Sequence, residues 1–332
     1  MSTRSNPNSP SSNRRPTSRR SPQRGRRRSA RRRRPFLVLF LLLLITGAGY
    51  FGFTALTNPE LPITLETGQA AVHFIDVGQG DATLIQTTAG SVLIDGGDNR
   101  LNMGEHVVQY LRDAGVSEIT YVIATHPHAD HIGGLIDVLH AFPIGTLIMP
   151  PVSHTTLTFE RFLDAIEAQD IYVRAPVAGG TFSVGEAVFT IIAPNASGYQ
   201  NLNDYSVSLR MVLGETSFIF TGDAEELSEL EMIAAGHILS SNVLRVGHHG
   251  SRTSTAQAFL DAVDPTIAVI SAGRDNGFGH PHRVVMERLE GLRIYRTDEH
   301  GHIIMVTDGT EITVKGAVVW RTWLNQLTQW IG

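Results

Sequence analysis

The chain contains no cysteine among its 332 residues, and this absence limits how it can be stabilised. Disulfide bonds are excluded, so a domain outside the cell would depend on its core and its metals alone. Thiolate metal ligands and a lipid-modified cysteine are excluded as well. Any metal site must therefore consist of nitrogen and oxygen donors, which suit zinc and also manganese or iron.

Acidic residues are absent from the first part of the chain. Residues 1–34 contain thirteen arginines and no Asp or Glu, whereas all 32 acidic residues lie from Glu60 onward. Only fourteen basic residues accompany those acids, so the chain after the tail has a charge of −18. Because the tail is rich in Arg, Ser and Pro and poor in apolar residues, we predict that it is disordered and cytoplasmic.

A long apolar run follows the tail. It extends from Phe36 to Leu56, which is 21 residues, and about 20 are needed to cross a bilayer as a helix. We predict a transmembrane signal-anchor at residues 35–57, with the arginines holding the amino end in the cytoplasm and the remainder of the chain outside. Residues 58–69 are then a linker, 70–315 a folded domain, and 316–332 a Trp-rich amphipathic segment.

Two alternatives to an uncleaved anchor stay open. A secretory signal also has a basic start and an apolar middle, although no convincing small-x-small cleavage site follows this run. Residues 33–37, Arg-Arg-Pro-Phe-Leu, also resemble a twin-arginine export signal. Cleavage by either route would give a secreted domain.

The folded domain is predicted to be α/β, with two strand-rich halves that each carry helices. Hydrophobic periodicity predicts strands at 71–77, 83–86, 92–95 and 121–125, and then at 187–192, 206–213, 217–220, 243–246 and 267–271. Helices are predicted at 105–114, 132–142, 159–168, 225–235 and 256–263, with a further one starting near Val284. This pattern suits two sheets packed face to face and covered on the outside by helices.

The densest group of metal-binding side chains follows the predicted strand at 121–125. Four of them, His126, His128, Asp130 and His131, occupy six positions. Residues two apart at the end of a strand point the same way, so His126 and His128 can share one ion, and Asp130 and His131 then face a second. Two glycines follow, Gly133 and Gly134, which would let the next helix start close against this group.

This string resembles the H-x-H-x-D-H signature of the metallo-β-lactamase superfamily. Three further segments restrict the resemblance to one family within this superfamily. They are residues 74–81 (Phe-Ile-Asp-Val-Gly-Gln-Gly-Asp), 246–251 (Val-Gly-His-His-Gly-Ser) and 279–281 (Gly-His-Pro). Together they are similar to the hydrolase domain of ComEC-type DNA-internalisation proteins, over residues 70–315. The resemblance implies a metallo-β-lactamase-like αββα four-layer sandwich with two metal ions at one edge.

The resemblance also makes Asp223 the ligand that bridges the two ions. Thr221, Gly222 and Asp223 follow the predicted strand at 217–220, which places the carboxylate at a strand end. Taken alone, an Asp in that position is an ordinary helix cap. We predict that Asp130 and Asp223 take part in catalysis as well as in metal binding.

One superfamily ligand is missing from this chain. The superfamily usually has a further histidine in the segment that reads 201–206 here, and that segment contains none. We predict that His248 or His249 replaces it, and the likeness to ComEC-type domains supports the substitution. Since neighbours on an extended chain point opposite ways, only one of the pair should bind metal and the other should face substrate. Asn203 or Asp204 could still assist from behind a ligand.

His280 is predicted to complete the coordination of the second ion, together with Asp130, His131 and Asp223. His282 lies two residues further on and competes for the role. The other seven histidines are expected to be surface or core residues without a partner cluster: His73, His106, His140, His154, His237, His300 and His302.

Several further residues are predicted to support the site or the substrate. Asp95 could accept the second N–H of a ligand histidine, although a strand-end turn explains it nearly as well. Asp76 and Asp81 flank a glycine turn and have the same two interpretations. Arg252 and Asn276, with Arg245 and Arg274, lie near the predicted active-site loops, where they could line a groove.

A site with two ions indicates a hydrolase, because such a pair activates water and neutralises charge on the substrate. The resemblance points to a phosphodiester such as DNA, in a role related to competence and DNA uptake. The charge of −18 after the tail argues against DNA, because binding to a duplex normally draws on clustered Lys and Arg. Small phosphoesters, lactones and β-lactams are alternatives, and the non-enzymatic alternative is an anchored module that binds DNA or a cell-wall polymer.

The predicted cofactors are two Zn²⁺ ions, with Mn²⁺ as the alternative. The predicted partners are the membrane, DNA and a separate membrane channel protein. ComEC-type transporters carry a many-helix channel, whereas this chain has one candidate span. The sequence does not determine the oligomeric state.

Overall fold

The computed structural model describes residues 61–100 and 103–316. The predicted tail (1–34), the predicted signal-anchor (35–57), the first residues of the linker and residues 317–332 lie outside this part of the chain. Among the residues described, no helix has the length and apolar character needed to cross a membrane.

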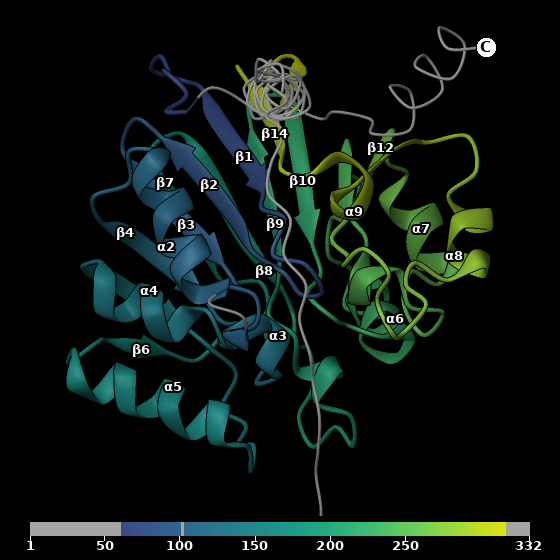
Figure 1. Cartoon of the computed structure of the whole chain (residues 1–332). Coiled ribbons are helices and arrows are strands. Elements are labelled where there is room, and N and C mark those ends of the chain that lie inside the picture. Colours follow the sequence, from purple (N-terminus) through teal and green to yellow (C-terminus); the bar gives the residue numbers. More distant parts are fainter. Residues whose placement is uncertain (1–60, 101–102, 317–332) are drawn as a thin grey trace, which may run out of the picture. The chain divides into compact units, whose positions relative to one another are not determined.

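The first sheet has eight strands and contains β1, the first strand of the described chain (Figure 1). Strands β3 to β6, which form one half of this sheet, run parallel to one another, and the other strands pair antiparallel. In spatial order the strands are β15 (Ile312–Gly316), β14 (Ile303–Thr307), β1 (Ala70–Phe74), β2 (Thr83–Thr87), β3 (Gly90–Ile94), β4 (Ile119–Ile123), β5 (Ile144–Ile148) and β6 (Val173–Arg174).

The second sheet has seven strands and faces the first. Its strands β10, β11, β12 and β13 run parallel, whereas β7 to β10 pair antiparallel. In spatial order the strands are β13 (Arg293–Arg296), β12 (Ile267–Ile270), β11 (Val243–Arg245), β10 (Thr216–Phe220), β9 (Ser208–Leu213), β8 (Ala187–Ala193) and β7 (Thr181–Val184).

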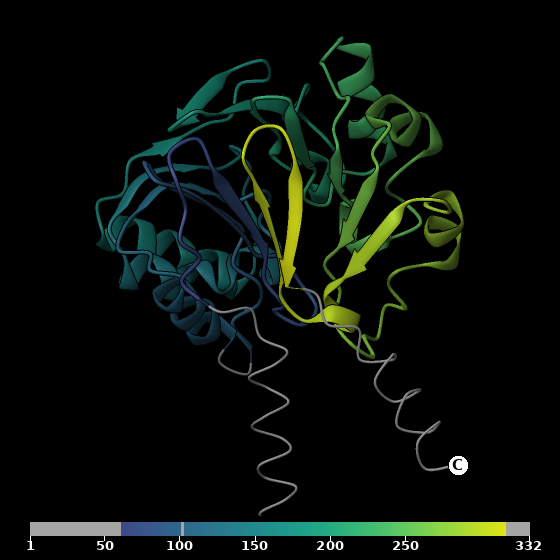
Figure 2. The same cartoon turned by 90° about the horizontal axis from the view of Figure 1, so that it is seen from above.

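Helices cover the outer face of each sheet, blue and teal on one side and green to yellow on the other (Figures 1 and 2). The helices on the first sheet are α2 (Met103–Asp113), α3 (Ala129–Ile132), α4 (Leu135–Ala141) and α5 (Leu157–Ala168). Those beside the second sheet are α6 (Glu226–Ala234), α7 (Gln257–Val263), α8 (Arg283–Arg288) and α9 (Thr297–His300). Two short 3₁₀ turns, η2 (Leu202–Tyr205) and η3 (Gly247–Gly250), lie in connecting loops.

Three apolar cores hold the layers together. The first lies between the sheets and includes Phe74, Phe189 and Phe218. The second joins the first sheet to α2, α4 and α5, and the third joins the second sheet to α6, α7 and α8. A sheet that buries both faces needs apolar residues throughout, and every residue of β1 and β10 is buried accordingly. The predicted arrangement of two facing sheets covered by helices is confirmed.

The predicted helix at 132–142 is wrong in one respect, because the structure has two helices there, α3 and α4, separated by Gly133 and Gly134. A Cβ atom on Gly133 would lie 2.6 Å from the backbone nitrogen of Asn99, and one on Gly134 would overlap the carbonyl oxygen of Gly96. The glycines thus allow a close backbone contact. The contact is with the loop after β3, whereas the sequence predicted one with the group of metal-binding side chains.

Six observed strands were not predicted from the sequence, namely β5, β6, β7, β13, β14 and β15. Four of these strands, β6, β7, β13 and β15, are at the edges of their sheets. An edge strand is partly exposed and short, so its hydrophobic pattern is weak.

The parallel strands determine where the functional loops lie. The carboxyl ends of neighbouring parallel strands meet at one edge of a sheet. Asp95 follows β3, and the His126 segment follows β4. Asp223 follows β10 and His248 follows β11, and the contacts of Asp223 with His126 and His131 bring the ends of the two sheets together at one site.

Candidate metal centre

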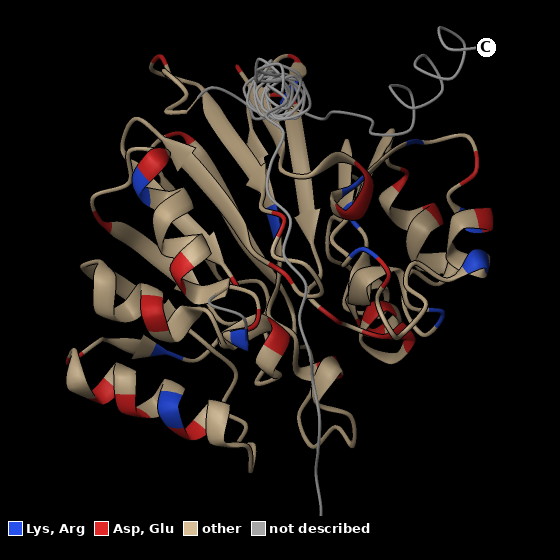
Figure 3. Cartoon of the chain, in the orientation of Figure 1, with Lys and Arg blue, Asp and Glu red and all other residues tan. Residues whose placement is uncertain are grey.

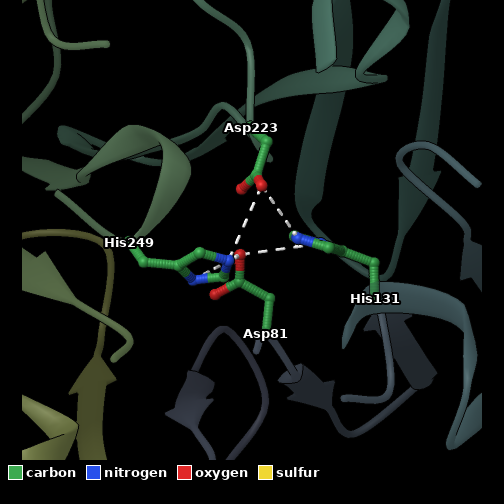
Figure 4. Close-up of side chains that lie close together, drawn as sticks. All are labelled: Asp81, His131, Asp223 and His249. Atoms are coloured by element: carbon green, nitrogen blue, oxygen red, sulfur yellow. Dashed lines mark ion pairs between the residues drawn. The ribbon is translucent and has the colours of Figure 1, made fainter. Parts of the chain in front are cut away.

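Four imidazole rings converge on one oxygen atom of Asp223. Asp223 is buried, and its backbone N–H donates to Ser206 Oγ at 3.0 Å. Figure 4 shows the inner part of the group, with Asp223 between two of the histidines. The distances from Asp223 Oδ2 are 3.1 Å to His131 Nε2, 3.6 Å to His249 Nε2, 3.7 Å to His248 Nε2 and 3.8 Å to His126 Nε2. The structure therefore brings together five of the predicted metal ligands.

His126 and His128 come together as the strand-end argument predicts. The Nε2 atom of His126 lies 2.9 Å from the Nδ1 atom of His128. Burial, and then the charge of His131, lowers the pKa of His126 well below 6.5, so its ring is neutral at pH 7. Neutral imidazole is the form that binds metal. His154 lies beside His128 with a ring separation of 5.7 Å, so its predicted isolation is wrong.

Asp95 hydrogen-bonds to His131, the contact that the first of its two interpretations requires. Its Oδ2 atom accepts from His131 Nδ1 and from Thr125 Oγ1, and its Oδ1 atom accepts from the Thr125 backbone N–H, all at 2.8 Å. The proton of His131 is thereby placed on Nδ1. The Nε2 atom then faces Asp223, as a ligand nitrogen must.

His248 and His249 do not point in opposite directions, so that prediction is wrong. Both have left-handed backbone angles, with φ of 48° and 55°, in the turn η3 rather than an extended chain. Both rings consequently face Asp223. His249 Nδ1 donates to the carbonyl of Ser271 at 3.0 Å, which leaves its Nε2 atom directed at the centre.

Glu225 supports His248 and was missed by the sequence analysis. Its Oε1 atom accepts from His248 Nδ1 at 3.2 Å, from Asn203 Nδ2 at 3.0 Å and from Thr253 Oγ1 at 3.0 Å. Asn203 therefore lies behind a candidate ligand, as predicted. Asp204 instead accepts the backbone N–H of Glu225 at 3.2 Å and so caps the turn before α6. The signal for Glu225 was its place two residues after Asp223.

Asp130 and His280 lie at the outer side of the cluster. Asp130 Oδ2 is 3.3 Å from His249 Nε2, and its side chain is 27% exposed. The ring of His280 is 5.6 Å from that of His248 and 6.0 Å from that of His249. His282 uses its Nδ1 atom to accept the backbone N–H of Arg252 at 3.0 Å. Of the two competing histidines, His280 is thus the one that faces the cluster.

Asp81 lies on the far side of the same rings. Its Oδ2 atom is 3.7 Å from His131 Nδ1 and 3.9 Å from His249 Nδ1, the nitrogens that face away from Asp223. Asp81, His131, Asp223 and His249 offer ligand atoms within 4.8 Å of one another. However, the carboxylate of Asp81 forms an ion pair with Arg245. We therefore assign the central role to Asp223 and a supporting role to Asp81.

Arg245 does not line a substrate groove, which corrects the prediction. It is 3% exposed, and its Nη1 atom donates to the Gly222 carbonyl at 2.6 Å. Burial lowers its pKa to about 9, which leaves it charged at neutral pH. Arg245 therefore offsets the charge of Asp81 and holds the loop that carries Asp223.

Two further predicted residues serve local structure. Asp76 Oδ1 accepts the backbone N–H of Gly78 at 3.0 Å, as the turn interpretation expects. Asn276 uses its amide within its own loop, donating to the carbonyls of Gly273 at 2.8 Å and His280 at 2.7 Å. It positions the loop of His280 rather than offering a donor to a substrate. Arg252 is exposed beside that loop.

Three histidines expected to be isolated form a second cluster. His73 Nδ1 lies 2.9 Å from the Tyr110 hydroxyl, and the rings of His106 and His302 stack at 5.5 Å. His302 Nδ1 accepts the backbone N–H of Asp76 at 3.0 Å. Burial, and then the neighbouring histidine, lowers the pKa of His73 to about 3 and that of His302 to about 4. His140, His237 and His300 hydrogen-bond to Gln169, Asn195 and Arg296, away from both clusters.

The electrostatics of the main cluster fit a cation. Burial alone lowers the pKa of His131, but the carboxylates of Asp223 and Asp95 outweigh burial and raise it well above 6.5. The carboxylates thus require positive charge, either as a proton on His131 or as metal. Within the described chain, Asp223 Oδ1 and His280 Nδ1 are buried without a hydrogen-bond partner. Buried nitrogen and carboxylate donors in this arrangement fit divalent metal ions.

Comparison with known proteins agrees with this geometry. Residues 75–274 match the sequence profile of the metallo-beta-lactamase superfamily. The chain belongs to this superfamily. Membership and the buried Asp and His cluster indicate a metal-dependent hydrolase.

Three curated relatives confirm the likeness to ComEC-type proteins. The chain is 30% identical to ComE operon protein 3 of Bacillus subtilis (strain 168), over 71% of this chain and 33% of the relative. It is 34% identical to Recombination protein 2 of Haemophilus influenzae, over 66% and 26%. It is 29% identical to Competence protein ComA of Neisseria gonorrhoeae, over 80% and 38%. The chain thus matches about a third of the length of these relatives.

Proposed function

We propose that this chain is a dinuclear-metal phosphodiesterase that acts on DNA or another phosphodiester. The observation that carries the proposal is the convergence of four imidazole Nε2 atoms on Asp223 Oδ2, at 3.1 to 3.8 Å. A single carboxylate surrounded in this way is suited to lie between two ions. A structural ion would need only one set of four ligands.

The flanking residues divide into two sets. One ion would be held by His126, His128 and His248. The ring nitrogens of the first two lie 2.9 Å apart, and the Nε2 atom of His248 lies 3.7 Å from Asp223 Oδ2. Asp130, His131 and His249 would hold the other, with His280 beside them. Zinc fits this set of nitrogen and oxygen donors, and manganese is the alternative. Such a pair of ions supplies Lewis-acid catalysis of hydrolysis.

The protein's own contribution is to orient each ligand. Asp95 holds the proton of His131 on Nδ1, Ser271 does so for His249, and Glu225 does so for His248. Partners of this kind fix the tautomer and the direction of a ligand ring. Asp130 is the more exposed of the two predicted catalytic carboxylates, at 27% against 3% for Asp223, so it lies closer to an incoming substrate.

The charge distribution favours a short or single-stranded substrate. Acidic residues (red) are spread along the outer helices, and basic residues (blue) are fewer (Figure 3). Duplex binding draws on many Lys and Arg contacts to phosphates. The names of the relatives, which refer to competence and recombination, support DNA as the substrate class.

Metal analysis and a substrate panel test this proposal. The purified chain should contain close to two divalent ions and should hydrolyse bis-p-nitrophenyl phosphate. Single-stranded DNA, duplex DNA and nitrocefin, assayed in parallel, separate a DNA phosphodiesterase from a small phosphoesterase and from a β-lactamase. Asp223→Ala is the inactive control. None or one ion, with no hydrolysis after Zn²⁺ or Mn²⁺ is added, would refute the proposal.

We further propose that residues 35–57 anchor the chain in the cell membrane with the hydrolase domain outside the cytoplasm, beside a separate channel protein. The thirteen arginines before this run and the acidic balance after it support that orientation. A reporter fused after Gly332 should be active only outside the cytoplasm, and protease added to spheroplasts should remove the domain. A domain that stays protected would contradict the orientation.

A further inference from the structure

The rim of the metal centre carries an exposed phenylalanine. Phe278 is 65% exposed and lies in the loop between β12 and α8, two residues before His280. Its ring stacks on the ring of His280 at 5.6 Å, with an angle of 20° between the planes. His280 in turn lies 5.6 Å from His248, ring to ring. One face of Phe278 is therefore covered by a residue of the cluster, and the side chain is otherwise largely open to solvent.

Asn276 holds the backbone of the loop that carries this ring. Asn276 Oδ1 accepts the backbone N–H of Phe278 at 3.2 Å and that of His280 at 3.0 Å. Glycines flank the phenylalanine, and a Cβ atom on Gly277 or Gly279 would meet nothing within 4 Å. The loop thus supports the backbone of Phe278 while leaving open space on both sides of it.

The exposed ring of Phe278 is an apolar surface that a substrate can contact. Most large apolar side chains of this domain are buried in the three cores. A flat ring next to a hydrolytic centre suits a flat group that arrives with the scissile bond. Nucleobases are such groups, and aromatic side chains stack on them without regard to base identity when the strand is single. Arg252, exposed on the neighbouring loop, adds positive charge for the backbone.

We propose that Phe278 is the stacking platform for the base next to the scissile phosphodiester, so that the site selects single-stranded nucleic acid. This inference rests on the phosphodiesterase function proposed above. The bases of duplex DNA could not stack on Phe278, because they are already paired and stacked on one another. Phe278 contributes to substrate affinity, whereas the His and Asp cluster around Asp223 carries out the hydrolysis.

Kinetics on two matched strands test the inference. A single-stranded oligonucleotide and the same strand with abasic sites are assayed with the metal-loaded full chain. Phe278→Ala should raise KM for the strand with bases by roughly 5- to 150-fold, the range of base–aromatic stacking, and should leave KM for the abasic strand unchanged. Phe278→Trp should restore the wild-type preference. Tyr172→Ala is the matched control, because Tyr172 is also an exposed aromatic, at 66%.

Binding gives a readout that is independent of activity. Fluorescence anisotropy of a labelled single strand with metal-free protein should show the same loss of affinity for Phe278→Ala, while metal content after reloading stays at the wild-type value. Equal kcat/KM for wild type and Phe278→Ala on both strands would overturn the inference and leave the phosphodiesterase function intact. Loss of metal, or an equal loss on both strands, would also overturn it by showing that Phe278 supports His280. No cleavage of either strand by wild type would refute both proposals.

Discussion

Replacing Asp95 by Asn should uncouple a ligand from its metal without removing any ligand. Three donors point at the two oxygens of Asp95, namely the Thr125 backbone N–H at Oδ1, and Thr125 Oγ1 and His131 Nδ1 at Oδ2, each at 2.8 Å. An amide has only one oxygen. If the oxygen serves Thr125, the amide NH₂ faces His131 and forces its proton from Nδ1 to Nε2, where it blocks metal binding.

The opposite amide orientation is costly in a different way. If the oxygen serves His131, the NH₂ group meets the backbone N–H of Thr125, which is fully buried and loses its acceptor. A buried donor left unpaired costs about 1–3 kcal/mol. Loss of a partner behind a ligand histidine typically costs 10- to 100-fold in metal affinity. We therefore expect Asp95→Asn to lower the free energy of unfolding by about 1–3 kcal/mol, or metal affinity by about 10- to 100-fold, or both.

Two measurements separate these effects. Urea unfolding of the metal-free chain reports stability, and calorimetric titration with Zn²⁺ reports affinity and the number of sites. Asp98→Asn is the matched control, since Asp98 is also buried in this loop but bonds to Arg100 and to no cluster histidine. A variant at Asp95 that matches wild type in both measurements would refute the role assigned to this carboxylate.

Three further outcomes follow from the structure. Glu225→Ala should lower metal affinity by about 10- to 100-fold in calorimetric titration, because it removes the oxygen that holds His248, and Glu225→Gln should retain most of it; equal losses would contradict a hydrogen-bonding role. Gly134→Ala should cost about 1–3 kcal/mol in urea unfolding because its Cβ would overlap a backbone carbonyl, whereas Gly277→Ala, where nothing lies within 4 Å, should cost far less. The depressed pKa of His73, about 3, means that the unfolded chain takes up a proton below pH 6.5 while the folded chain does not, so stability present above pH 6.5 is lost on acidification, by about 2 kcal/mol at pH 5. His73→Gln should flatten this part of the stability profile, and an unchanged slope would contradict the assignment.

Much of the fold could be predicted because its signals are local. Each of the nine predicted strands overlaps an observed strand, namely β1, β2, β3, β4, β8, β9, β10, β11 and β12. Buried strands are continuous apolar runs, and such runs are visible in the sequence without knowledge of their neighbours. The unassigned strands β6, β7, β13 and β15 lie at sheet edges, where pairing with one neighbour stabilises a segment whose own pattern is weak.

The sequence by itself determined which segment carries the candidate metal ligands. His126, His128, Asp130 and His131 are so close in the chain that a strand end followed by a helix turn places them together, and the structure shows them at one site. The position of Asp223 after β10 could be predicted for the same reason.

Only the tertiary structure decided how the other groups meet this segment. The left-handed turn that directs both His248 and His249 inward, the contact of Asp95 with His131 and the burial of Arg245 against Asp81 all join residues from different strand ends. Periodicity reports which face of an element is apolar, and it carries no information on which loops the packing of two sheets brings into contact. The candidate metal-binding motif could therefore be predicted from the sequence, whereas the contacts that orient its side chains depended on the fold.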